Sequence, residues 1–192
     1  MTVDGTCSLL GGATVVLDDG GTFSVSSTGM LTTAVGTTSG APEITTANGA
    51  AFMDIVIDGS LDVSGLIVTQ GGSGGVAAMT VSSTATAGTF NHVQWRSPNA
   101  GAGFLLFEAD HDSSTDPRFR GHDFGDANGS AIVEIDNAAS DIEFAAFLYD
   151  GTDSPSNGDA TQADADDLET AGTITWVESF EWEGDVDEDW DT

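Results

Sequence analysis

The sequence has almost no positive charge. Its 192 residues include 32 acidic residues, three arginines (Arg96, Arg118 and Arg120) and no lysine, which gives a formal net charge of −29. A nucleic-acid-binding protein needs cationic side chains to replace the counterions of phosphates, so this class of function is excluded. Binding to anionic membrane surfaces is excluded for the same reason, and polyanionic ligands would be repelled unless metal ions intervened.

Cysteine and long hydrophobic runs are also scarce. Cys7 is the only cysteine, which excludes an internal disulfide and a cysteine-based metal site. The longest apolar-leaning stretch, Leu9–Leu17, is interrupted by two glycines and is far shorter than the ~20 residues that span a bilayer. No cationic segment followed by an apolar one marks a secretory signal. We therefore expect a soluble chain, either made without a classical signal or a piece of a longer protein.

The acidic residues indicate a saline environment. There are 23 aspartates and 9 glutamates. Dense carboxylates repel one another, and dissolved salt screens that repulsion. The alternative is a compositional bias of the lineage without selection for salt.

Short apolar runs dominate the chain, and helical periodicity is nearly absent. The runs are three to seven residues long and many alternate with period two, as in Phe52–Ile57 and Phe90–Trp95. Turn clusters such as Asp58-Gly59-Ser60 separate them. This pattern predicts an all-β chain.

An internal repeat narrows the architecture. Two segments, one beginning at Met79 and the other at Val133, align without gaps, and a weaker copy (Phe104–Leu106, Phe119 and Phe124) lies between them. Each repeat therefore contains one or two coils of roughly 22–27 residues, the period of strands that wind as a solenoid. The aligned positions are Met79 with Val133, Val81 with Ile135, Phe90 with Phe144, Val93 with Phe147 and Trp95 with Tyr149.

This pattern resembles the right-handed parallel β-helix (β-solenoid) proteins of phage virions and bacterial surface fibres, over roughly residues 10–178. The resemblance implies three short strands per coil, polar corners and inward ladders of apolar side chains. We therefore expect a single-stranded right-handed parallel β-helix of about seven to eight coils. The competing architecture is a β-sandwich or jelly roll, whose hairpins also show short strands and turns.

Two polar segments and the C-terminus interrupt this pattern. Residues 109–129 and 151–169 are predicted to be loop insertions. We divide the chain into a β-helix domain, 1–178, and an acidic tryptophan-containing tail, 179–192, that serves as a cap or an intersubunit strand. The spacing of Trp182, Gly184 and Trp190 resembles a strand of β-solenoid repeats in large surface proteins and some marine phage structural proteins. Thr2–Leu10 is a second candidate cap or intersubunit strand, because the open sheet edges of a β-helix invite pairing.

The densest group of candidate acids and imidazoles is Asp110, His111 and Asp112 together with His122 and Asp123. Facing a groove, it could serve as a catalytic or metal site, and with Trp95 it could form a carbohydrate cleft. The alternative is a solvated loop, and we predict no catalytic residues. Trp95 and Trp176 are predicted to fill the core or a corner.

Oxygen-rich runs near the C-terminus are candidates for calcium. They do not follow the EF-hand loop, because its required glycine is missing. The candidate ligands are Asp164, Asp166, Asp185, Asp187 and Asp189.

We therefore predict a non-catalytic structural or attachment protein on an outer surface, most simply a fibre or capsid decoration of a phage from saline water. Phage β-helix fibres are commonly trimeric, so the resemblance implies homo-oligomerisation or binding to other virion or surface proteins. One alternative is a module of a secreted bacterial adhesin or surface fibre, which would place the chain outside the cell. A second is a carbohydrate-binding or carbohydrate-active β-helix with a glycan receptor, and a third is calcium-dependent assembly.

Overall fold

The chain folds into a stack of parallel β-strands. The computed structural model describes residues 1–34, 40–48, 52–72, 76–97, 102–108, 119–125, 133–145, 148–149 and 167–177. Within these ranges there is no helix, and every pairing between strands is parallel. The predicted all-β parallel solenoid is thereby confirmed, and the sandwich or jelly roll, which needs antiparallel hairpins, is wrong.

Three strand segments make each of the first coils. The first coil is β1 (Thr2–Val3), β2 (Thr6–Leu10) and β3 (Thr14–Leu17), and the second is β4 (Thr22–Val25), β5 (Met30–Ala34) and β6 (Glu43–Thr46). In the third and fourth coils, one long strand replaces the second and third segments. These coils are β7 (Asp54–Ile57) with β8 (Ser60–Thr69), and β9 (Met79–Val81) with β10 (Thr86–Arg96).

The long strands bend to follow two faces of the solenoid. The beginning of β8 pairs with β5 and its end pairs with β6. The bend lies at Gly65, whose φ of 84° is accessible to glycine. In β10 the corresponding bend lies at His92, with a φ of 55°. Each long strand therefore covers two faces of the solenoid, which the earlier coils cover with two shorter strands joined by a turn.

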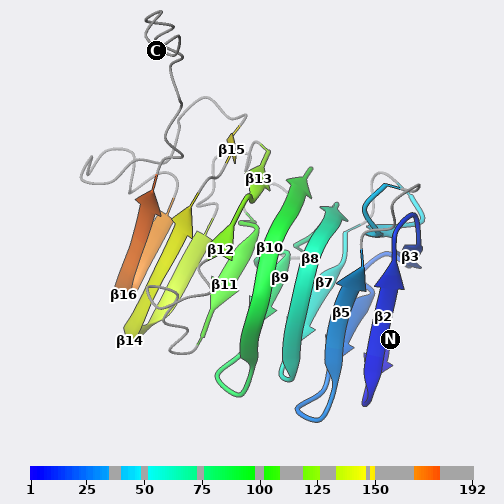
Figure 1. Cartoon of the computed structure of the whole chain (residues 1–192), viewed down its shortest axis with the longest axis horizontal. Coiled ribbons are helices and arrows are strands. Elements are labelled where there is room, and N and C mark those ends of the chain that lie inside the picture. Colours follow the sequence, from blue (N-terminus) through cyan, green and yellow to red (C-terminus); the bar gives the residue numbers. More distant parts are fainter. Residues whose placement is uncertain are drawn as a thin grey trace, which may run out of the picture.

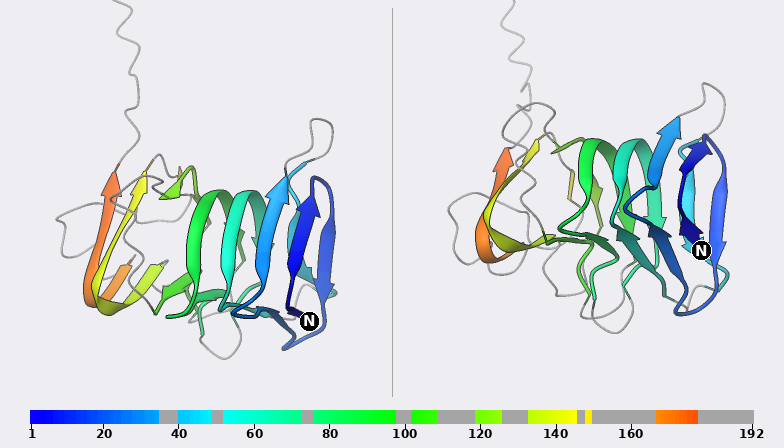
Figure 2. Two further views of the ribbon diagram at one scale, coloured as in Figure 1. Left: turned by 60° about the horizontal axis from the view of Figure 1, so that its bottom comes forward. Right: turned by 90° about the horizontal axis from the view of Figure 1, so that it is seen from below.

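The remaining strands continue the stack toward its C-terminal end. They are β11 (Leu105–Phe107), β12 (Phe119–Arg120), β13 (Asp123–Phe124), β14 (Val133–Ala145), β15 (Leu148–Tyr149) and β16 (Asp167–Val177). One sheet runs β1-β4-β7-β9-β11-β14, and the other runs β2-β5-β8-β10-β13-β15. Figures 1 and 2 show this progression from the blue N-terminal strands at one end to the orange β16 at the other.

The pairing register of the strands shows that one internal repeat spans two coils. Leu105 pairs with both Met79 and Val133. Phe124 likewise pairs with Trp95 and Tyr149. The weaker intermediate copy in the sequence is therefore the coil between the two stronger ones.

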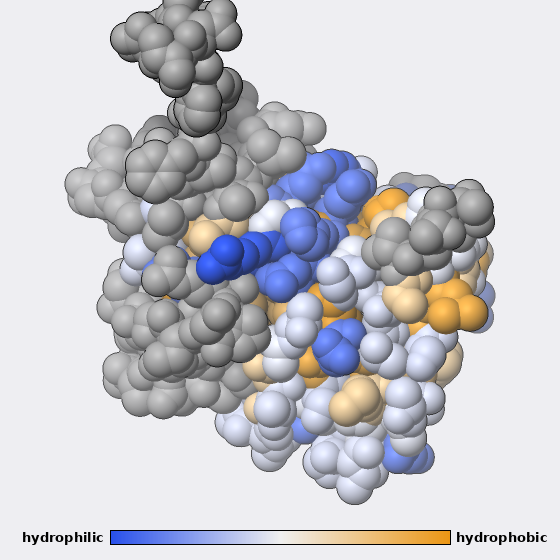
Figure 3. Space-filling model, in the orientation of Figure 1, coloured by the Kyte–Doolittle hydropathy of each residue, from blue (hydrophilic) through white to orange (hydrophobic). Residues whose placement is uncertain are grey.

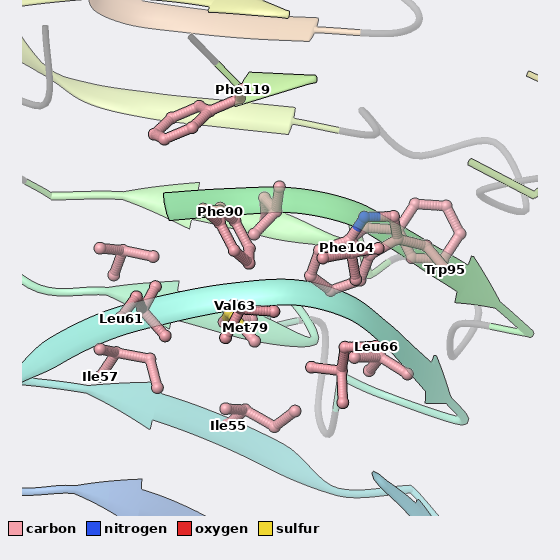
Figure 4. Packing of buried hydrophobic residues seen from close by; sticks show 14 of the residues in the cluster. Ile55, Ile57, Leu61, Val63, Leu66, Met79, Phe90, Trp95, Phe104 and Phe119 are labelled. Atoms are coloured by element: carbon pink, nitrogen blue, oxygen red, sulfur yellow. The ribbon is translucent and has the colours of Figure 1, made fainter. Parts of the chain in front are cut away.

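Inward side chains of successive coils form one apolar spine. In several short strands alternate positions are buried, as with Phe23 and Val25 in β4 and Ile55 and Ile57 in β7. Figure 4 shows the spine between β7 and β12, where aliphatic residues give way to aromatic ones toward Phe119. Each fully buried large apolar side chain contributes about 1.5–3 kcal/mol, so the spine is the main source of stability.

Tight corners bring the coils into contact through polar groups. The Thr28 hydroxyl donates to the Asp4 carbonyl at 3.2 Å, and the Thr84 hydroxyl donates to the Asp58 carbonyl at 3.0 Å. A Cβ built on Gly59 would lie 2.3 Å from the carbonyl oxygen of Gly29 in the preceding coil. Only a residue without a side chain fits a corner packed so closely against its neighbour.

Two predictions about the layout need correction. The solenoid has about four regular turns, not seven to eight. The spacing of paired residues also varies: Thr2 pairs with Ser24 at one end of a sheet, whereas Val133 pairs with the much later Asp167 at the other. The coils are therefore longer and less even than the predicted period. The segment 109–129 is not wholly an insertion, because β12 and β13 belong to the two sheets. The tail 179–192 lies outside the described residues.

Candidate functional site

The predicted cluster of acids and imidazoles is not a single exposed group. Asp110, His111 and Asp112 lie outside the described residues. His122 and Asp123 are described, and their side chains differ in environment: His122 is fully buried, whereas the Asp123 side chain is 24% exposed. His122 cannot exchange protons with a bound solute from this position, so neither the candidate exposed site nor the alternative of a solvated loop describes this residue.

His122 is held in the spine by both ring nitrogens. The indole Nε1–H of Trp95 donates to His122 Nδ1 at 3.1 Å, and His122 Nε2 lies 2.9 Å from the carbonyl oxygen of Phe90. An indole N–H only donates and a carbonyl only accepts. The imidazole therefore carries its proton on Nε2 and is neutral.

Aromatic rings enclose this imidazole. The ring centroid of His122 lies 5.0 Å from that of Phe90, 5.2 Å from Phe144 and 5.6 Å from Phe124. Desolvation by this burial lowers the pKa of His122 from 6.5 to about 4, although the hydrogen bond to Phe90 partly opposes it. Protonation would place an N–H on Nδ1 against the N–H of Trp95, so geometry and burial favour the same neutral form.

Asp123 is engaged in a structural ion pair. Arg96 Nη2 binds Asp123 Oδ2, and Arg96 Nη1 donates to the backbone oxygens of Trp95 and Asp123 at 2.8 and 2.9 Å. The guanidinium thus ties β10 to β13. Arg120 is exposed, and Arg118 lies outside the described residues.

The described tryptophans do not form sugar platforms. Trp95 is fully buried, stacked on Phe124 and tilted against Phe104. Trp176 is 3% exposed and stacks on Phe144. The prediction that both tryptophans fill the core is confirmed, and the proposed carbohydrate cleft loses Trp95.

None of the five candidate calcium ligands can be placed. Asp164, Asp166, Asp185, Asp187 and Asp189 all lie outside the described residues. In the part of the chain that the structure describes, no group of three or more His, Cys, Asp or Glu residues could hold a metal ion. Calcium binding by the C-terminal aspartates stays a prediction.

The first coil is the clearest candidate for an interaction site. Within the described residues, β1 pairs only with β4, β2 only with β5 and β3 only with β6. The outer edges of three strands therefore have no strand partner there. Thr2–Leu10, predicted to be a cap or an intersubunit strand, forms two of these three edges.

Apolar side chains gather at this end. Leu10 is 63% exposed and Val16 is 53% exposed. Figure 3 shows hydrophobic surface on the side of the molecule where Figure 1 places β2 and β3. The inward residues of the first coil, Val3, Leu9 and Leu17, keep 6–9% exposure, whereas Phe23 of the second coil keeps none. The spine is therefore incompletely covered at its N-terminal end.

Sequence reasoning missed the burial of His122 and found only part of the open end. Phe119, His122 and Phe124 share the interior with the spine, and His122 and Phe124 have the two-residue spacing of an inward face. That spacing next to phenylalanines is the signal that could have identified the histidine as a core residue. The exposed Leu10 and Val16 could not be distinguished by sequence from core positions.

The fold defines the protein as a parallel β-solenoid. Searches against protein-family models, curated proteins and solved structures found no match. Within the described ranges, no helix has the length and apolar character to cross a membrane.

Proposed function

We propose that this β-solenoid is a non-catalytic structural or attachment protein of an outer surface. Its most specific form is a fibre or capsid decoration of a phage from a saline environment. The observation that carries the proposal is the use of one imidazole and both described indoles: His122, Trp95 and Trp176 are all built into the spine. These groups, which often perform chemistry in clefts, serve here to stack one coil on the next.

The surface charge supports the same role. A net charge of −29 keeps copies soluble where salt screens their repulsion. Chemistry on a polyanionic sugar would be opposed by that field. A solenoid with an apolar interior and a carboxylate-rich sequence is suited to holding shape and spacing rather than to catalysis.

Location and activity test the proposal together. Antibodies raised against the purified chain would be used for gold-labelling electron microscopy of virus particles and cells from the source culture, with pre-immune serum as the control. We expect label on the outside of virus particles. Label on cell-surface fibres instead would favour the bacterial adhesin, and label confined to the cell interior would contradict an outer-surface role.

A sugar screen tests the absence of catalysis. The full chain would be incubated with a polysaccharide panel and the release of reducing ends measured, alongside a glycan array. We expect no release. Release of reducing ends by the wild type would contradict the proposal. A matched preparation of the Asp123→Asn variant would then locate the activity, because release that continues in this variant would show an active site elsewhere on the chain.

A further inference from the structure

We propose that two copies of this chain associate through their first coils, N-terminal end to N-terminal end, with the β2 strands pairing antiparallel across a two-fold axis. This inference rests on the proposed structural role and identifies the binding partner as a second copy of the chain. It starts from the edge of β1, β2 and β3, which no described strand covers.

This edge lacks the features that normally keep sheet edges apart. Natural edges carry lysine, proline, charged side chains or bulges that prevent pairing. The three strands of the first coil contain no charged residue and no proline. In a chain with 32 acidic residues, only Asp4 is acidic among the first 17 positions.

The first coil is shaped like an interior coil that is missing its neighbour. Gly5 follows Asp4 as Gly59 follows Asp58, at matching corners. A Cβ on Gly59 would strike the preceding coil, whereas a Cβ on Gly5 would meet nothing within 4 Å. The corner at Gly5 is therefore open to another coil edge.

Charge determines which end of a second copy fits. Of the 32 acidic residues, 25 come after Phe107, and residues 63–107 contain none. Since the coils stack in sequence order, the described acids Glu134 and Glu143 lie toward the far end of the solenoid. Head-to-tail stacking would bring Glu134 and Glu143 toward a neighbour, whereas N-terminal contact keeps these acids of the two copies far apart.

The symmetry of such a contact is the common one for two identical chains. An isologous two-fold contact places the same surface on both sides. With Ser8 at the centre of β2, Ser8 faces Ser8 of the second copy, and Leu10 and Val16 gain neighbours. High salt should strengthen the contact, because at 1 M the screening length falls to about 3 Å.

The test compares two matched variants of the full chain. Sedimentation and light scattering at low and about 1 M NaCl give the association constant of the wild type, Ser8→Glu and Ser83→Glu. Both serines are exposed, but Ser83 lies in the fourth coil, away from the edge. We expect a salt-favoured dimer for the wild type and Ser83→Glu, and dimerisation weakened about tenfold or more by Ser8→Glu, since like charges would face each other. Circular dichroism would verify that both variants are folded.

Crosslinking at the single cysteine distinguishes the two orientations. The Cys7 side chain on β2 is partly buried against the N-terminal end of the core, and this burial raises the pKa of its thiol, so a short bis-maleimide would be applied at mildly alkaline pH. N-terminal contact puts the two Cys7 residues roughly 8 Å apart, whereas head-to-tail stacking separates them by about 30 Å. We expect a covalent dimer that Ser8→Glu prevents.

Three results would overturn the inference: a monomer at every salt concentration, equal weakening by both variants, or a dimer that does not crosslink at Cys7. None of them bears on the proposed function, which gold labelling and sugar release test independently. A monomer located on the particle surface would leave that proposal standing and remove this one.

Discussion

Acid should destabilise this protein through one buried imidazole. The unfolded chain takes up a proton at His122 near pH 6.5, whereas the folded chain resists until about pH 4. Stability that is fully present above pH 6.5 is therefore lost as the pH falls toward 4. Between pH 7 and about pH 5, the linkage relation gives a loss of about 2 kcal/mol from this residue alone.

Carboxylates oppose that loss, so the measurement needs matched variants. As the pH falls toward the pKa values of the 32 acidic side chains, their mutual repulsion decreases and the folded state gains stability. Urea unfolding would be followed from about pH 7.5 to about pH 4.5 for the wild type, His122→Gln and His92→Gln. The first substitution removes the buried imidazole, and the second removes an exposed one from the same strand stack.

The difference between the curves isolates the buried group. We expect His122→Gln to be less stable at neutral pH, because it loses ring packing, but to lose about 2 kcal/mol less than the wild type between pH 7 and about pH 5. His92→Gln should stay close to the wild type and lose only slightly less stability, because His92 makes the smallest contribution to lowering the pKa of His122. Parallel curves for the wild type and His122→Gln would refute the neutral imidazole between Trp95 and Phe90.

Four further predictions concern packing, salt and calcium. Gly59→Ala should lower the unfolding free energy by about 1–3 kcal/mol in urea titration, because its Cβ overlaps the Gly29 carbonyl, whereas Gly5→Ala should be nearly neutral; equal effects would contradict the open first coil. Trp95→Phe should cost at least about 1–3 kcal/mol by leaving His122 Nδ1 without a donor, and no change in calorimetry would argue against that hydrogen bond. Raising NaCl from low to about 1 M should raise the melting temperature, since it screens a net charge of −29, and a flat response would argue against adaptation to salt. Calcium should bind the aspartate-rich C-terminal tail in calorimetry, and chelator should lower the melting temperature; unchanged melting would remove the calcium prediction.

The sequence was sufficient to predict the parallel solenoid because the interior repeats. Every coil must place apolar side chains at equivalent positions, so Met79, Leu105 and Val133 occupy one ladder and are chemically alike. Hairpins impose no such long-range similarity. The gapless alignment of Met79 with Val133 therefore indicated parallel stacking before any pairing was known.

The number of coils could not be obtained in the same way. Connections on the outside of a solenoid are free to vary in length, because they run in solvent and bury little. The coil that leads from Thr22 to its partner Asp54 is clearly longer than the next one, which leads from Ile55 to its partner Met79. Dividing the length of the chain by a single period consequently overestimated the regular turns.

Position in the stack decided which polar residue became part of the core. His122 and His92 have the same chemistry, yet one is enclosed by rings and the other is exposed at a bend with a positive φ. The donor from Trp95 and the acceptor of Phe90 come from the adjacent coil, 27 and 32 residues away. Local sequence around His122 contains neither partner, so its spacing from Phe124 could indicate a core position, but its hydrogen bonds and neutral form were accessible only from the register.

Salt is expected to raise both the melting temperature of a single chain and the association constant of two copies. The Ser8→Glu variant separates these two effects. The substitution changes the net charge from −29 by a single unit, which is too small a change to alter how screening affects folding. Its new carboxylate lies where two first coils would meet, so it changes association strongly. If salt raises the melting temperature of both proteins equally at concentrations too low for association, and raises that of the wild type further only where it dimerises, the end contact is a specific surface and not a general consequence of reduced repulsion. If dimerisation instead follows net charge alone, Ser83→Glu will weaken it equally, and the uncharged strands of the first coil will have no special role in assembly.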